Sequence, residues 1–168
     1  MIAVKKTKRG FTLIELLIVI AIIAILAAVV FVALNPLKRF QDTRDARRAA
    51  DINALLSAIK VHQVDNSGNY LSAISSMTAG SVYLIGTDTS SCTAYNSSCD
   101  TAVTGATTCV DLSGLVTGGY VGSVPVSPNG AGTWTAGHTG YTLSRSSTGI
   151  VTVRSCESED TTEISVAR

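Results

Sequence analysis

Residues 11–34 read FTLIELLIVIAIIAILAAVVFVAL, and this apolar stretch decides the fold. Its only charged residue is Glu15. As a helix the stretch is about 36 Å long, which is enough to cross the roughly 30 Å hydrocarbon core of a bilayer. A carboxylate at the centre of such a helix costs about 2.5 to 3.5 kcal/mol, and even near one end it needs a partner or a path to water. The sequence therefore predicts an N-terminal membrane-spanning helix with an unusual charge.

The residues before this stretch are basic and end in a glycine. Lys5, Lys6, Lys8 and Arg9 precede Gly10. Residues 8–29, KRGFTLIELLIVIAIIAILAAV, resemble the class III signal peptide and transmembrane start of type IV pilins and the related pseudopilins. The resemblance implies that a prepilin peptidase cuts between Gly10 and Phe11 on the cytoplasmic side of the inner membrane and N-methylates Phe11. Glu15 would then be the fifth residue of the mature chain.

Two interpretations of Glu15 follow. Cleavage gives Phe11 a new α-ammonium, and a carboxylate one helical turn away, on the same or a neighbouring chain, can neutralise it inside the membrane. A subunit joining a bundle would satisfy that charge at only one axial position. The alternative is that Glu15 merely extends to the headgroup region. We favour the pairing role, because the basic leader, the glycine and the glutamate occur together at the family's spacing.

The flanking charges give little information on orientation. Basic residues also follow the apolar run, partly offset by acids: Lys38, Arg39, Arg44, Arg47 and Arg48 against Asp42, Asp45 and Asp51. The orientation is instead indicated by the implied cleavage on the cytoplasmic side and by the cysteines described below. Both place the N-terminus in the cytoplasm and the rest of the chain outside the inner membrane. A secretory signal cut by ordinary signal peptidase is the competing interpretation, but it needs a small-x-small site after the apolar region. Residues 33–37, ALNPL, do not provide one.

The helix is expected to break at Pro36 and then to continue as an amphipathic helix to about residue 66, where Gly68 can take the left-handed conformation that ends a helix. Pro36 lacks an amide hydrogen and disfavours helical geometry at the residue before it. An apolar stripe then recurs at spacings of three and four residues: Ile52, Leu55, Leu56, Ile59 and finally Gln63. The polar residues 42–51, DTRDARRAAD, are either a solvated face or a contact between neighbouring subunits.

The remaining residues predict a small antiparallel sheet. Serine and threonine make up 35 of the 102 residues in 67–168, which favours strands and long loops over helices. The candidate strands are residues 81–85, 141–144, 150–154 and 163–166, with a turn at 146–149. We therefore expect an α+β, pilin-like fold, in which a long N-terminal helix packs on three or four strands. Its expected parts are a leader (1–10), a transmembrane helix (11–34), an amphipathic continuation (35–66) and an extracytoplasmic head (67–168).

Four cysteines occur, all in the predicted head: Cys92, Cys99, Cys109 and Cys156. An even number without a C-x-x-C pair indicates disulfides in an oxidising compartment rather than free thiols or a metal site. Of the three connectivities, we expect Cys92 with Cys99 and Cys109 with Cys156. The second pair also fits the resemblance, since a disulfide often ties down the C-terminal region in that family.

No binding site for a cofactor or nucleic acid is evident. The charge is +6 over residues 1–48 and −5 over residues 49–168, and a mildly acidic head lacks the basic surface that nucleic acids require. Residues 124–130 faintly resemble the P-x-D-P-W-G segment near which major pseudopilins bind calcium, but Ser127 and Asn129 replace the acid and the tryptophan. Calcium would then rely on the acidic tail; otherwise the segment is a rigid turn beside a solvated tail. The acids of that tail are Glu157, Glu159, Asp160 and Glu163.

The expected function is structural. The sequence contains no nucleophile elbow, phosphate loop or metal-binding histidine pair, and His62 and His138 are expected to be ordinary side chains. The resemblance implies a subunit of a type IV pilus-like or type II secretion-like filament, a homopolymer or a mixed one. An inner-membrane platform protein and a cytoplasmic ATPase would be its partners. The alternatives are a minor or tip subunit for adhesion or DNA uptake, and a membrane-tethered binding domain that never polymerises.

Overall fold

The structure is a computed structural model of the 168-residue chain and describes residues 10–168. The basic residues of the leader lie outside the described residues. The chain divides into two units, Met1–Arg39 and Phe40–Arg168, and each is described by itself.

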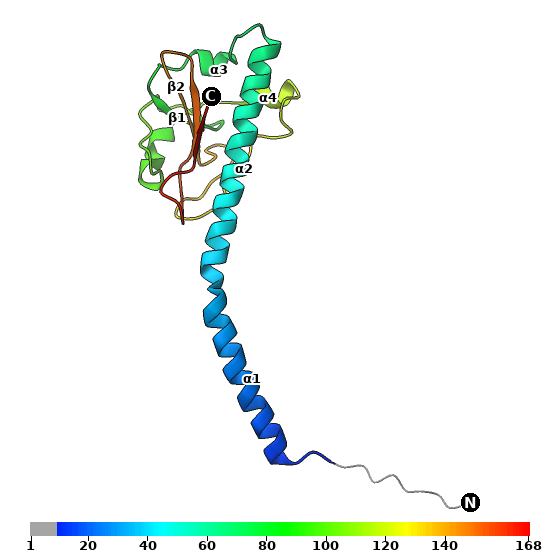
Figure 1. The fold of residues 1–168 in the computed structure, drawn as a ribbon. Coiled ribbons are helices and arrows are strands. Elements are labelled where there is room, and N and C mark those ends of the chain that lie inside the picture. The colour runs from blue at the N-terminus through cyan, green and yellow to red at the C-terminus, as the bar shows by residue number, and fades with distance from the viewer. Residues whose placement is uncertain (1–9) are drawn as a thin grey trace, which may run out of the picture. The chain divides into compact units, whose positions relative to one another are not determined.

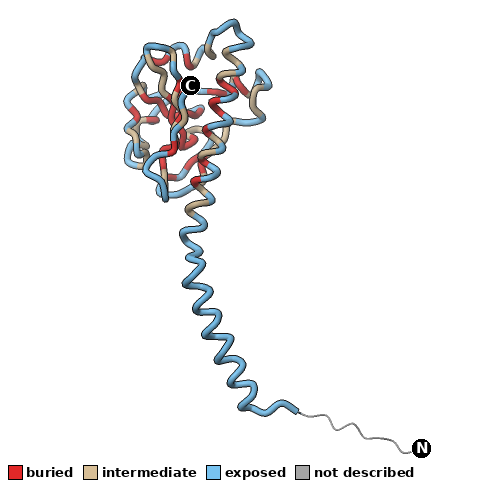
Figure 2. The backbone as a smooth tube through the Cα atoms, viewed as in Figure 1, coloured by how far each residue is buried: buried red, intermediate tan, exposed pale blue. Residues whose placement is uncertain are grey.

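The first unit is dominated by helix α1 (Leu13–Leu34), which begins directly after Thr12. None of its 22 residues is buried, and Figure 2 shows the exposed colour along its whole length. By length and composition it is able to cross a membrane. The part of the chain that the structure describes does not cover this apolar surface, which requires lipid or protein around it.

The helix breaks at Asn35. This residue has a left-handed backbone (φ 37°), and helix α2 (Pro36–Asp65) starts at the next residue. Pro36 disfavours helical geometry at Asn35 but is well suited to the first position of a new helix, where no amide hydrogen is needed. Asparagine tolerates the left-handed conformation better than most residues. The sequence Asn-Pro thus ends one helix and begins the next within a single residue.

Helix α2 presents one buried face to the head. Its buried positions recur at spacings of about three and four residues, as one stripe of a helix requires. They are Asp45, Arg48, Ile52, Leu55, Leu56, Ala58 and Ile59. The helix ends where Gly68 (φ 88°) donates its amide to the carbonyl of Gln63 at 2.8 Å. This is the glycine-dependent stop that the sequence predicts.

Four antiparallel strands form the sheet of the head, in the order β1-β2-β3-β4. They are β1 (Val82–Leu84), β2 (Tyr141–Arg145), β3 (Val151–Ser155) and β4 (Ser165–Ala167). Helix α3 (Ser72–Ser75) precedes β1. The long connection from β1 to β2 contains the 3-10 helix η1 (Cys92–Ser98) and the short helix α4 (Ser113–Thr117). Figure 1 shows α2 running alongside the strands.

The core lies between α2 and the sheet. Side chains alternate between the two faces of β3, so Val151 and Val153 both point to the buried face. They belong to the same apolar cluster as Leu55, Ile59 and other residues of α2. A second cluster contains Leu84, Trp134 and the cysteines. The α+β, pilin-like prediction is therefore confirmed, with four strands.

The predicted disulfide pairing is wrong. All four cysteines are bonded, but the pairs are Cys92–Cys109 and Cys99–Cys156. Cys92 begins η1 and Cys99 follows its last residue. At a rise of about 2 Å per residue, seven residues separate them by roughly 14 Å, about twice the largest Cα separation that a disulfide can bridge. Backbone hydrogen bonds from Cys92 to Thr107 and from Asp100 to Cys156 instead bring the observed partners together.

Candidate functional site

The first candidate site is the start of α1, where Thr12 and Glu15 cap the helix reciprocally. The Glu15 carboxylate accepts hydrogen bonds from the Thr12 amide (2.8 Å) and the Thr12 hydroxyl (2.9 Å). The Thr12 hydroxyl in turn accepts from the Glu15 amide at 3.3 Å. This arrangement satisfies helix-terminal donors and places a negative charge at the positive end of the helix dipole. Glu15 therefore has a local partner even though it belongs to an apolar helix.

The two residues at the predicted cleavage point lie just outside this cap. Gly10 and Phe11 are non-helical, and Phe11 is 85% exposed. A peptide bond in non-helical, exposed backbone can enter a protease cleft without prior unwinding. An α-ammonium formed at Phe11 would sit one residue before the helix cap and four before Glu15, where a carboxylate already lies.

The capping role of Glu15 was not anticipated from the sequence, although its signal is present. A threonine followed three residues later by glutamate, directly before an apolar run, is the capping-box pattern. Thr12 and Glu15 fit it. The lone charge in the apolar stretch directed the prediction towards the amine of Phe11, on the same or a neighbouring chain, and away from Thr12.

The second candidate site is a charged cluster formed by Arg48, Asp45, Glu157, Glu159 and Arg44, here called the Arg48 cluster. The Arg48 side chain is fully buried. Its guanidinium donates to Asp45 (2.8 Å), Glu159 (2.8 Å) and Glu157 (3.0 Å). The remaining two donors bind the Ser127 hydroxyl (3.2 Å) and the Pro128 carbonyl (3.0 Å). All five donors of this guanidinium are thus used, as a buried arginine requires.

The acidic members of the Arg48 cluster hold two further segments to α2. Glu157 also accepts from the Trp134 indole at 3.0 Å and from the amides of Ala131 and Gly132. The Asp45 carboxylate accepts hydrogen bonds from the backbone amides of Glu159 (2.9 Å) and Asp160 (2.8 Å). The cluster therefore clamps the loop before β2 and the segment after Cys156 onto the same helix.

Arg44 completes the cluster from the rim. Its guanidinium contacts the Glu159 carboxylate through two nitrogens, one of them at 2.6 Å. This contact, followed by that with Arg48, lowers the pKa of the Glu159 carboxyl to about 2. The same ion pair raises the pKa of Arg44. Glu159 is therefore an anion throughout the ordinary pH range, held by two cations.

Two residues of the polar face at residues 42–51 differ from both of its predicted roles, whereas Arg47 is exposed and lies 4.0 Å from Asp51 as a solvated face predicts. Asp45 and Arg48 are buried within their own chain, neither solvated nor set aside for a neighbour. Their positions extend the apolar stripe through Ile52 and Leu55 at spacings of three and four. That continuity was the available signal, because a charged residue on the buried face of a helix requires a partner elsewhere in the chain.

The residues present do not fit a calcium site. The Ser127 hydroxyl accepts a hydrogen bond from Arg48, and Glu157 and Glu159 are paired with arginines. Glu163 contacts Arg154 at 2.6 Å. Among residues 10–168, no group of three or more His, Cys, Asp or Glu side chains is placed to hold a metal ion. The oxygen donors that calcium would need are already bound to cations of the chain.

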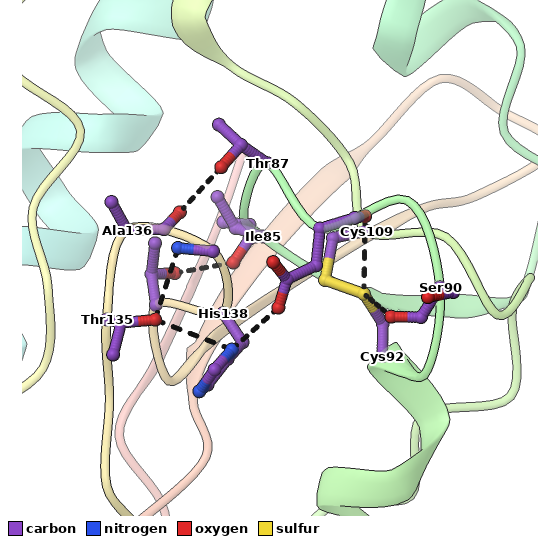
Figure 3. Close-up of a disulfide and its surroundings, with 11 residues drawn as sticks. Ile85, Thr87, Ser90, Cys92, Cys109, Thr135, Ala136 and His138 are labelled. Carbon is purple, nitrogen blue, oxygen red and sulfur yellow. Dashed lines mark hydrogen bonds and ion pairs between the residues drawn. A yellow bond between two sulfur atoms is a disulfide. The ribbon is translucent and has the colours of Figure 1, made fainter.

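The two histidines make ordinary structural contacts. Figure 3 shows His138 beside the Cys92–Cys109 disulfide, with its Nδ1 2.7 Å from an Asp88 carboxylate oxygen. Its ring stacks on Tyr95, with the centroids 4.0 Å apart. His62 packs edge-on against Tyr120. A carboxylate can orient a histidine for catalysis, but the Thr135 hydroxyl lies 3.4 Å from the same Nδ1 atom that binds Asp88. This arrangement differs from a triad, in which the nucleophile binds the opposite nitrogen.

Residues 5–31 match the prokaryotic N-terminal methylation motif. This motif is typical of type IV pilins and pseudopilins. The comparisons with curated proteins and with solved structures gave no match to the chain. The similarity thus covers the start of the chain, including Gly10, Phe11 and Glu15, whereas the head is described by its own structure alone.

Replacing Arg48 with methionine is expected to lower the free energy of unfolding of the head by about 3 to 5 kcal/mol. The substitution leaves Glu157 and Asp45 buried without their cation, which is the costly way to break a buried ion pair. Denaturant unfolding of the detergent-solubilised chain, followed by Trp134 fluorescence, measures the change. Arg47→Met is the matched control, since the Arg47 side chain is 66% exposed and 4.0 Å from Asp51. Equal unfolding midpoints for the two variants would contradict the clamp.

The Glu159 ion pairs predict a loss of stability in acid. The pKa of Glu159 falls from an ordinary 4.5 to about 2 on folding, so its contribution is fully present above pH 4.5 and is lost as the pH falls towards 2. Glu159→Gln should therefore be less stable than wild type at pH 6, with the difference shrinking between pH 4.5 and 2.5. Thermal unfolding at several pH values measures it. A difference that stays constant over this range would argue against the pairing.

Proposed function

We propose that the protein is a structural subunit of a type IV pilus-like or type II secretion-like filament, assembled from the inner membrane after cleavage by a prepilin peptidase. One observation carries the proposal: a carboxylate, Glu15, is held at the N-terminal end of an entirely exposed apolar helix, within residues that match the N-terminal methylation motif. Capping alone would make Glu15 useful in any helix that starts at this point. In a subunit whose new N-terminus must be neutralised, its negative charge has a second role.

The exposure of α1 supports assembly through this helix. All 22 of its residues are open to a surrounding medium, which is lipid while the subunit is in the membrane. Once the subunit is extracted, water would face the same surface at a cost of about 25 cal/mol per Å² of apolar area. Equivalent helices of neighbouring copies offer the same apolar cover as lipid. In this scheme an assembly ATPase and an inner-membrane platform protein drive the extraction, and helix packing retains the subunit.

The proposed orientation places the N-terminus in the cytoplasm and the head outside the inner membrane. The proposed cleavage point, between Gly10 and Phe11, lies just before the apolar helix, as a peptidase acting at the cytoplasmic face requires, and the methylation motif at residues 5–31 includes both. Both disulfides belong to the head, which suits an oxidising compartment. The exposed Phe11 would then carry the methylated amine at the membrane boundary of the mature subunit.

Gly10→Leu should block processing, because a branched side chain would occupy the position next to the scissile bond where the family has glycine. The variant is expected to accumulate as a longer precursor that retains the leader. Gel mobility and N-terminal sequencing of membrane fractions measure this outcome, with Gly122→Leu in the head as the control that should still be cleaved. Recovery of Gly10→Leu with Phe11 as its first residue would overturn the cleavage assignment.

Glu15→Val should leave the protein cleaved and membrane-bound but absent from sheared filaments. Glu15→Gln sharpens this test, because glutamine keeps the acceptor of the helix cap but removes the negative charge. It should fail to assemble as well. Thr12→Val removes the capping hydroxyl while Glu15 keeps its charge, so this control should still form filaments. Normal filament yield from Glu15→Gln would rule out the charge-pairing mechanism.

A further inference from the structure

Residues 124–130, which do not fit a calcium site, end in the only asparagine of the sequence that is followed by glycine. These two residues are Asn129 and Gly130, and both are exposed. The side-chain carbonyl of an asparagine lies next to the backbone amide of the following residue, so the two groups are reactants held within one molecule. Glycine has no Cβ to obstruct their approach. The pair therefore contains the reacting groups of an intramolecular deamidation.

The contacts of Asn129 favour this reaction at its side-chain carbonyl. The Trp134 backbone amide donates to Asn129 Oδ1 at 2.9 Å, and Trp134 is itself buried and bound to Glu157, which fixes this donor in place. A fixed donor stabilises the negative charge that develops on Oδ1 when a nucleophile attacks the carbonyl carbon. Among residues 10–168, neither Asn129 Nδ2 nor the Gly130 amide has an acceptor. The leaving group and the nucleophile are thus both available.

The other five asparagines of the sequence lack this combination. Asn35 precedes a proline, whose nitrogen carries no hydrogen and cannot close the ring. The remaining four are followed by residues with a Cβ, and their side-chain nitrogens donate to backbone carbonyls, which holds the group that must leave. They are Asn53, Asn66, Asn69 and Asn96. The structure therefore singles out Asn129.

We infer that Asn129 is a site of self-modification, at which the folded chain converts this asparagine into aspartate or isoaspartate. The Gly130 nitrogen bonds to Asn129 Cγ and releases its proton to solvent, while Nδ2 takes up a proton and leaves as ammonia. The product is a succinimide ring. Water opens the ring at Cγ to give aspartate, or at the backbone carbonyl to give isoaspartate. Overall one water is consumed and one ammonia is released, so no oxidant or cofactor is required.

Modification at Asn129 would act on the Arg48 cluster, because the residues on both sides of the site are bound to that cluster. The Pro128 carbonyl accepts from Arg48 at 3.0 Å, and the Ala131 amide donates to Glu157 at 3.2 Å. Isoaspartate lengthens the backbone between these two fixed points, and either product adds a negative charge beside carboxylates that are already present. The loop before β2 would then be held less firmly. This consequence does not depend on the filament function proposed above.

Mass spectrometry of the full-length, detergent-solubilised protein tests the site. The protein is incubated at neutral pH, sampled over several days and digested, and each asparagine is scored for the mass gain of an amide that becomes an acid. Asn66 and Asn69 are the internal controls, since both are exposed. Asn129 should convert at least about tenfold faster than either, a ratio that corresponds to about 1.4 kcal/mol. Conversion of Asn129 that is no faster than theirs, or that does not occur, would overturn the inference.

The same time course in denaturant separates the contribution of the fold from that of the Asn-Gly sequence. Unfolding removes the Trp134 donor, so Asn129 should convert more slowly in denaturant than in the folded protein. Unfolding also releases the bound side-chain nitrogens of Asn66 and Asn69, which should therefore convert faster. Asn129→Gln is the control variant, because its longer side chain would have to close a larger ring, and it should show no mass gain at this position. Faster conversion of Asn129 in the unfolded chain would show that the sequence reacts without help from the fold, and would overturn the assignment to the folded structure.

Discussion

The exposed apolar surface of α1 is the constraint on which the rest of the structure depends. No residue of this helix is buried among residues 10–168, and a surface this apolar requires cover by lipid or by protein. A surface of this kind is stable in water only when it is covered. The break at Asn35 and Pro36 marks where that requirement ends, because α2 buries one face against the head. The chain thus combines a helix that needs partners with a domain that supplies its own core.

The head is stabilised by contacts within its own unit. Two devices contribute besides the apolar core. The Arg48 cluster ties the loop before β2 and the C-terminal segment to α2, and the Cys99–Cys156 disulfide fixes that segment next to Glu157. A charge buried without compensation would destabilise the head, whereas here every donor of Arg48 has an acceptor. Asp45, Arg48 and Arg44 of α2 therefore serve the fold of the subunit itself.

Much of this could be predicted from the sequence, because the signals were local. The apolar run, the Asn35-Pro36 break, the stop at Gly68 and the strand candidates each depend on neighbouring residues. Long-range pairings were missed. The disulfide partners depend on how the residues between β1 and β2 fold back, and two of the acids that bind Arg48, Glu157 and Glu159, lie more than 100 residues away. The Thr12–Glu15 cap is a different case, since its pattern was present but the charge in the apolar run suggested another partner.

The central claim is that α1 exchanges a lipid environment for the same helix of neighbouring copies, with the charge of Glu15 matched to the amine of Phe11. A reconstruction of sheared filaments by electron cryomicroscopy tests this most directly. The account predicts that the α1 helices pack around the filament axis and that each Glu15 carboxylate lies within hydrogen-bonding distance of a Phe11 amine. Filaments in which α1 lies at the periphery, or in which Glu15 faces only apolar side chains, would contradict it.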